Sequence, residues 1–90
     1  MPLSPLDLAE ATQTVDTLLA RLELDAFLFA IEHNERGWEL RVECAADDGW
    51  VADTIALGDE LPGDSEADAP LRDRLLAVLV ERLGHCKKLR

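Results

Sequence analysis

The residues from Trp38 to Cys44 alternate without a break between apolar and charged side chains. Trp38, Leu40, Val42 and Cys44 fall on one side of such a segment, and Glu39, Arg41 and Glu43 fall on the other. A period of two is typical of a β-strand with one buried face and one face in water. The chain therefore needs neighbouring strands beside this segment and a cover over its apolar side.

A strand over residues 27–32 and the turn residues Asn34–Gly37 precede this segment. A four-residue loop at 34–37 places His33 opposite Trp38. The same register pairs Ile31 with Leu40, Phe29 with Val42, and Phe27 with Cys44. These large apolar residues then lie on one face, whereas a slip by one residue would scatter them, which favours this pairing.

A second hairpin is predicted at Asp47-Asp48-Gly49, because an Asp-Gly pair favours a tight turn. A loop with an even number of residues puts Val51, Ile55 and Leu57 on the core face and turns Trp50, Ala52, Thr54 and Ala56 outward. An odd loop would bury Trp50 instead. The even loop is favoured, although it leaves Asp53 on the core face, either beyond the reach of the helices or at a β-bulge.

A helix is expected on each side of the three strands. The first is predicted to start at Ser4-Pro5 and to run to about Leu22, with Ser4 as its cap. The second is predicted to start with Asp68 as its cap and Pro70 in its first turn, and to end at Gly84. Leu8, Ala11, Val15, Leu18, Leu19 and Leu22 form the apolar face of the first helix, and Leu71, Leu75, Val78, Leu79 and Leu83 that of the second. Leu76 and Val80 make the second stripe wider than one sheet needs.

The predicted fold class is α+β, in the order α-β-β-β-α. We expect residues 1–90 to form one domain, a three-stranded antiparallel meander with both helices packed on one face. Residues 58–68 contain two Gly, one Pro and five acidic residues, which predicts an exposed, mobile loop. Residues 85–90 are expected to form a short basic tail in water.

The chain is strongly acidic, with 19 Asp plus Glu, nine Lys plus Arg and a net charge of −10. Residues 23–68 hold fourteen of the acidic residues and only two basic ones, Arg36 and Arg41. Such a charge repels nucleic-acid phosphates and acidic membrane surfaces. It suits a soluble protein, one with a basic protein partner, or one that mimics a polyanion.

The two cysteines, Cys44 and Cys86, are too few for a disulfide framework, and free thiols in a reducing cytoplasm are expected. The amino terminus lacks the basic-then-apolar pattern of a signal peptide. No apolar run approaches the roughly 18 residues of a membrane span.

Residues for catalysis or for binding a cofactor are sparse. The only serines are Ser4 and Ser65, the only histidines are His33 and His85, and there is no glycine-rich phosphate loop. His85 and Cys86 are adjacent, and adjacent residues on a helix or strand do not face one point. Residues 64–68 look like the start of a calcium loop, but Ala69 and Leu75 stand where its glycine and its bidentate glutamate belong. We therefore expect no enzyme activity, no cofactor and no metal.

The element order resembles that of double-stranded-RNA-binding domains, which carry a basic cluster at the start of the last helix. Here the only basic residues at that point are Arg72 and Arg74, beside Asp68 and Asp73, which does not favour phosphate binding. The leading amphipathic helix and the meander also look like the small acidic chaperones of bacterial secretion systems. Those proteins are usually longer and have a second strand pair, and no residue motif supports the likeness.

The features that remain are surface features. The candidate interaction surface consists of Leu28, Trp50, Ala52, Leu76 and Val80. They predict a small bacterial-type protein-binding module, an adaptor or chaperone-like factor that forms a homodimer and does not bind nucleic acid or membranes. The alternative is an acidic inhibitor or regulator that mimics nucleic acid and occupies a basic groove on a partner. The sequence does not identify that partner.

Overall fold

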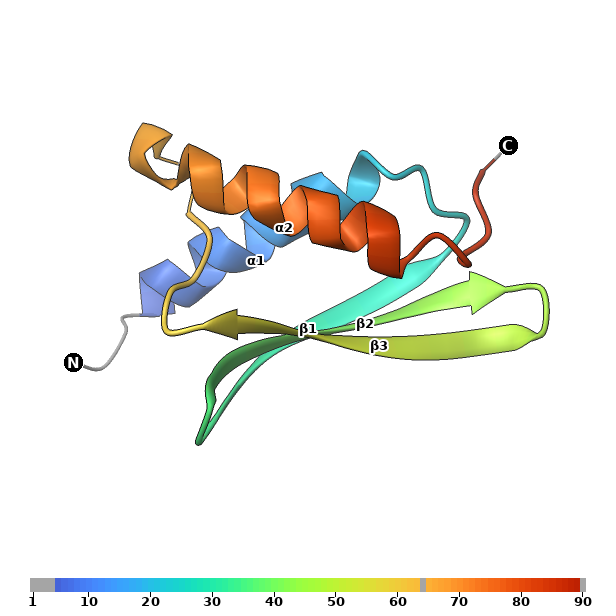
Figure 1. Cartoon of the computed structure of the whole chain (residues 1–90), viewed down its shortest axis with the longest axis horizontal. Helices are drawn as coiled ribbons and strands as arrows, with labels where there is room; N and C mark the ends of the chain where they lie inside the picture. The colour runs from blue at the N-terminus through green and yellow to red at the C-terminus, as the bar shows by residue number, and fades with distance from the viewer. Residues whose placement is uncertain (1–4, 64, 90) are drawn as a thin grey trace.

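The computed structural model describes residues 5–63 and 65–89, and for residues 5–7 the backbone alone. The elements are α1 (Pro5–Ala20), β1 (Phe27–Asn34), β2 (Gly37–Ala46), β3 (Gly49–Gly58), the 3-10 turn η1 (Glu66–Asp68) and α2 (Ala69–Arg82). The strands form one antiparallel sheet in the order β1-β2-β3, and both helices lie on the same side of it (Figure 1). The predicted α+β fold and its element order are confirmed.

The apolar face of β2 is the centre of the core. Leu40, Val42 and Cys44 are completely buried, and two sets of helical residues cover them. Val15, Leu18 and Leu19 come from α1, Leu75 and Leu79 come from α2, and Leu83 follows α2 directly. Each such side chain contributes roughly 1.5–3 kcal/mol through burial, so the core joins the middle strand to both helices.

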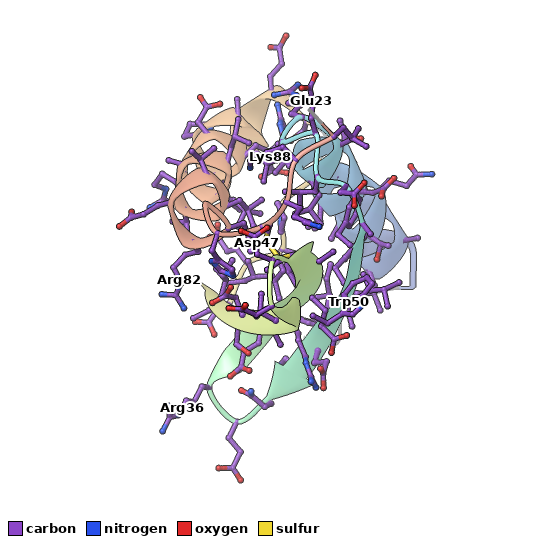
Figure 2. All side chains as sticks on the ribbon, turned by 90° about the vertical axis from the view of Figure 1, so that its right-hand side faces the viewer. Glu23, Arg36, Asp47, Trp50, Arg82 and Lys88 are labelled. Carbon is purple, nitrogen blue, oxygen red and sulfur yellow. A yellow bond between two sulfur atoms is a disulfide. The ribbon has the colours of Figure 1, made fainter. Side chains whose placement is uncertain are left out.

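The register between β1 and β2 is the predicted one, with His33 opposite Trp38 and Phe29 opposite Val42. Gly37 closes this hairpin with a φ of 110°, and a Cβ at this position would lie 2.6 Å from the carbonyl oxygen of Gly58. Only glycine fits so close an approach of two backbones. The hairpin tip, marked by Arg36, projects away from the helices (Figure 2).

The second hairpin has the even loop, with Ala46 paired to Gly49 across Asp47 and Asp48. Ile55 is therefore buried, and Trp50 and Ala52 are exposed on the open face. Asp53 lies opposite Val42 in a regular ladder, so the bulge that was one explanation for its position is absent there. The irregularity in this pair of strands falls between Trp38 and Glu39 instead.

One helix end differs from the prediction. α1 ends at Ala20 rather than near Leu22, because tight turns follow it and Glu23 takes a left-handed φ of 54°. α2 ends at Arg82 with Leu83 as its C-cap, so Gly84 follows the helix end as predicted. Asp68 occupies the cap position of α2 without making a side-chain cap hydrogen bond, and its Oδ2 accepts one from Ser65 Oγ at 3.2 Å instead. The predicted cap of α1, Ser4, lies outside the described residues.

The segment between β3 and α2 is only partly the exposed loop that was expected. Pro62 and Gly63 are buried, so the prediction of exposure is wrong for these two residues. Arg72 of α2 donates hydrogen bonds from Nη1 to the carbonyl oxygens of Gly63 and Ser65, each at 2.7 Å. A guanidinium with several donors can hold two carbonyl groups at once, and here it fixes the loop against α2.

Candidate functional site

A disulfide joins Cys44, on the core face of β2, to Cys86, in the turn that follows α2. Their Cα atoms lie 5.8 Å apart although they are separated by 42 positions in sequence. Cys44 is fully buried and Cys86 is only 4% exposed. The free thiols expected from the sequence are therefore wrong for this structure, because the fold brings the turn after α2 directly over the middle strand.

His85 and Asp53 lie beside this disulfide. His85 Nε2 is 3.2 Å from Asp53 Oδ2, and the two side chains are 44% and 23% exposed. Asp53 faces the helical side of the sheet but lies past the end of α2, where the turn carrying His85 covers it. The contact with His85 and the position past the end of α2 explain how the core face of β3 accommodates an acidic residue.

Cys44, His85 and Cys86 form a cluster of possible ligands. One ligand atom from each lies within 4.8 Å of the others, and we call these three residues with Asp53 the thiol–imidazole cluster. The sequence argument against it was that adjacent residues diverge on a helix or strand. That argument fails because residues 85 and 86 are in a turn, where successive side chains can converge. The expectation that these residues extend into water is wrong for Cys86, which is buried, whereas His85 is exposed.

The segment after Cys86 is hydrogen-bonded to the rest of the fold. The amide N–H of Lys87 donates to the Ala45 carbonyl at 2.7 Å, and that of Leu89 donates to the Glu23 carbonyl at 2.7 Å. Asp25 donates in turn to the Lys87 carbonyl at 2.8 Å. Figure 2 shows Glu23 and Lys88 at the same end of the molecule. The predicted free basic tail is therefore a fixed backbone segment with exposed side chains over residues 87–89.

The candidate interaction surface divides into two parts. Leu28 and Ala52 lie in one cross-strand row of the open face with Glu43 between them, and Trp50 lies in the next row beside Ala45. Leu28 is 63% exposed and Trp50 is 57% exposed. The central strand of this face carries an ion pair between Arg41 and Glu43 at 3.2 Å.

The other part lies on α2, on the opposite side of the sheet (Figure 1). Val80 is 54% exposed, whereas Leu76 is half-buried and packs against the core. The structure therefore does not bring Leu76 and Val80 together with Leu28, Trp50 and Ala52.

A shallow groove of about 280 Å³ separates β3 from α2. Its lining is mostly apolar and includes Ile55, Leu57, Pro62, Leu71, Leu75 and Val78. Glu60 and Arg74 stand at its edge. The groove contains no cysteine, histidine or serine, so it adds no nucleophile to the thiol–imidazole cluster.

No protein-family model, no curated protein sequence and no solved structure significantly matches this chain. No helix within residues 5–63 and 65–89 has both the length and the apolar character needed to cross a membrane.

Proposed function

We propose that this protein is a non-enzymatic protein-binding module that uses the open face of its sheet. The observation that carries the proposal is the exposure of Leu28 and Trp50 on a face that neither helix covers. Tryptophan and large aliphatic side chains are enriched where proteins bind partners. The small side chains of Ala45 and Ala52 between them leave room for a partner's side chains.

The first partner in this proposal is a second copy of the chain. The open face carries both signs of charge along β2, where Arg41 stands between Glu39 and Glu43. A two-fold axis that passes between Arg41 and one of these acidic residues sets each copy's Arg41 against an acidic residue of the other, since contacts across a two-fold axis are reciprocal. The dimer then acts as an adaptor or chaperone-like factor for a further protein, without direct binding to nucleic acid or membranes.

Sedimentation equilibrium tests the dimer and its surface. Leu28→Glu places a charge on the open face, and we expect it to raise the dimer dissociation constant by roughly tenfold or more, which is about 1.4 kcal/mol. Val80→Glu is the matched control on α2 and leaves the dimer intact. If Val80→Glu loses the dimer and Leu28→Glu does not, the dimer contact lies on α2. An unaltered chain that is monomeric at high concentration contradicts the homodimer.

A second candidate function follows from the distribution of acidic residues. Asp47 and Asp48 at the tip of the β2–β3 hairpin are exposed, and so are Asp59 and Glu60 after β3. They support an inhibitor that mimics nucleic acid in a basic groove. Salt separates the two functions: association of two chains of charge −10 strengthens as salt screens their repulsion, whereas binding to a basic groove weakens steeply.

The proposed compartment is the cytoplasm. Its thiol pool keeps most cysteine pairs reduced, so a cytoplasmic location requires the Cys44–Cys86 disulfide of this structure to be opened in the cell. Trapping the thiols in intact cells with an alkylating reagent and counting the alkyl groups by mass spectrometry tests this. Recovery of the unalkylated disulfide contradicts a cytoplasmic location.

A further inference from the structure

The geometry points to a metal site that forms when the Cys44–Cys86 disulfide is reduced. We infer that the two thiolates and the imidazole of His85 bind one Zn²⁺ ion, while Asp53 orients the imidazole. The cluster brings together residues from β2, from β3 and from the turn after α2. This inference is independent of the proposed protein-binding surface, because Leu28 and Trp50 lie on the other face of the sheet.

The distances suit a tetrahedral site. The ligand atoms of Cys44, His85 and Cys86 already lie within 4.8 Å of one another. Zn–S bonds of about 2.3 Å place two sulfurs of a tetrahedral site about 3.8 Å apart. A disulfide that opens therefore needs only a short separation of its sulfurs. The backbone amides of Cys86 and Lys87 are hydrogen-bonded to the carbonyls of Leu83 and Ala45, at 3.0 and 2.7 Å, so rotation of the cysteine side chains supplies that separation.

Asp53 supplies the usual support for a metal-binding histidine. Its Oδ2 lies 3.2 Å from Nε2 of His85, which is the distance of a hydrogen bond from a ring N–H to a carboxylate. Because Nε2 faces Asp53, the nitrogen left to bind the metal in this proposal is Nδ1. Such a carboxylate fixes both the tautomer and the orientation of the ring.

The change from disulfide to metal site balances with a thiol reductant. A dithiol, or two molecules of a monothiol, supplies two electrons and two protons, so the S–S bond breaks, two thiols form and the reductant becomes a disulfide. Zn²⁺ then displaces one proton from each thiol as the two Zn–S bonds form. Disulfide and metal exclude each other, because both use the same two sulfurs.

The donor set selects the metal. Two thiolates and an imidazole favour Zn²⁺ over Mg²⁺ or Ca²⁺, which prefer oxygen ligands. Three protein ligands leave the fourth position to water or to an incoming group. The 44% exposed side chain of His85 places the site at the surface, where an ion can enter.

The test uses the whole chain reduced with a phosphine, which does not compete for zinc as a dithiol does. After incubation with Zn²⁺ and gel filtration, we expect one zinc per reduced chain and none per oxidised chain. Co²⁺ in place of Zn²⁺ is expected to give a thiolate-to-cobalt charge-transfer band. A reduced chain whose two thiols react with a thiol reagent but which retains no zinc overturns the inference.

Variants assign the ligands. His85→Ala is expected to lose the zinc and to change the cobalt spectrum, and His33→Ala is the matched control in the β1–β2 hairpin. Asp53→Asn is expected to weaken zinc binding by about 10- to 100-fold. A His85→Ala spectrum identical to that of the unaltered chain overturns the assignment of His85.

Nuclear magnetic resonance of the unaltered chain avoids any doubt about whether a variant folds. The ring nitrogens of His85 are expected to shift when Zn²⁺ is added to the reduced chain, while those of His33 stay unchanged. The opposite pattern, or no shift at either histidine, overturns the inference. The oxidised chain serves as the reference sample.

Discussion

Asp53 Oδ2 lies 3.2 Å from His85 Nε2, so the acidic residue on the core-facing side of β3 is paired with a residue from the turn after α2. An acidic side chain is costly to bury without a partner. The pair lies at the rim of the core, next to the Cys44–Cys86 disulfide. Asp53, which fits the alternating pattern of β3 least, therefore lies beside Cys44, His85 and Cys86, the only cluster of cysteine and histidine found in the described residues.

Loss of the disulfide is predicted to destabilise the fold. The bond closes a loop between residues separated by 42 positions, and a loop of this size contributes roughly 2–4 kcal/mol, chiefly by restricting the unfolded chain. Urea unfolding of Cys86→Ser against the oxidised chain, without added metal, is expected to show this loss. Reductant is expected to lower the stability of the unaltered chain and to leave that of Cys86→Ser unchanged. Equal stability of Cys86→Ser and of the oxidised unaltered chain contradicts the prediction.

Leu40→Ala is predicted to cost about 2–5 kcal/mol, because Leu40 is completely buried at the centre of β2. Leu28→Ala is the matched control, since the same truncation at a 63% exposed position changes stability by about 0.5 kcal/mol or less. Chemical denaturation followed by circular dichroism measures both. Similar losses for the two variants would mean that the two faces of the sheet are assigned wrongly.

Trp50 is predicted to be readily quenched in solution. Trp38→Phe leaves Trp50 as the only tryptophan, and Trp50→Phe leaves Trp38, which contacts the His33 ring with centroids 4.6 Å apart. Acrylamide is the suitable quencher because it is neutral, whereas an anion is repelled by a chain of charge −10. We expect steeper quenching in Trp38→Phe, and the reverse order would place Trp50 in a protected position.

Arg72→Ala is predicted to free the loop before α2. Both hydrogen bonds from Arg72 Nη1 to Gly63 and Ser65 are lost, and we expect amides within residues 59–63 to exchange about fivefold faster, equivalent to about 1 kcal/mol. Arg74→Ala is the control on the same helix, because Arg74 makes no hydrogen bond within the described part of the chain. Unchanged exchange in Arg72→Ala would show that burial of Pro62 and Gly63 alone holds the loop.

The strand register could be predicted because it depends on short-range patterns. Phe29 and Val42 belong to runs of period two joined by a turn of fixed length, so only one alignment keeps the large residues on one face. The same reasoning located Trp50 and Ala52 on the open face. Helix ends were harder to predict. The end of α1 depends on the left-handed backbone of Glu23, and glutamate is not a residue type that indicates such a turn.

The thiol–imidazole cluster could not be predicted from spacing. Cys44 and Cys86 are 42 positions apart, and their meeting depends on how α2 crosses the sheet and where it ends. Two signals were nevertheless present in the sequence. Asp53 broke the apolar pattern of its strand, and an adjacent His85-Cys86 pair followed a helix that had to lie over Cys44.

The hydrogen bonds that Lys87 and Leu89 make to Ala45 and Glu23 can form only late in synthesis of the chain. All three strands are synthesised before these residues, so the backbone partners of Ala45 and Glu23 are added after the sheet. The last bonds of the fold form only when translation has passed residue 89.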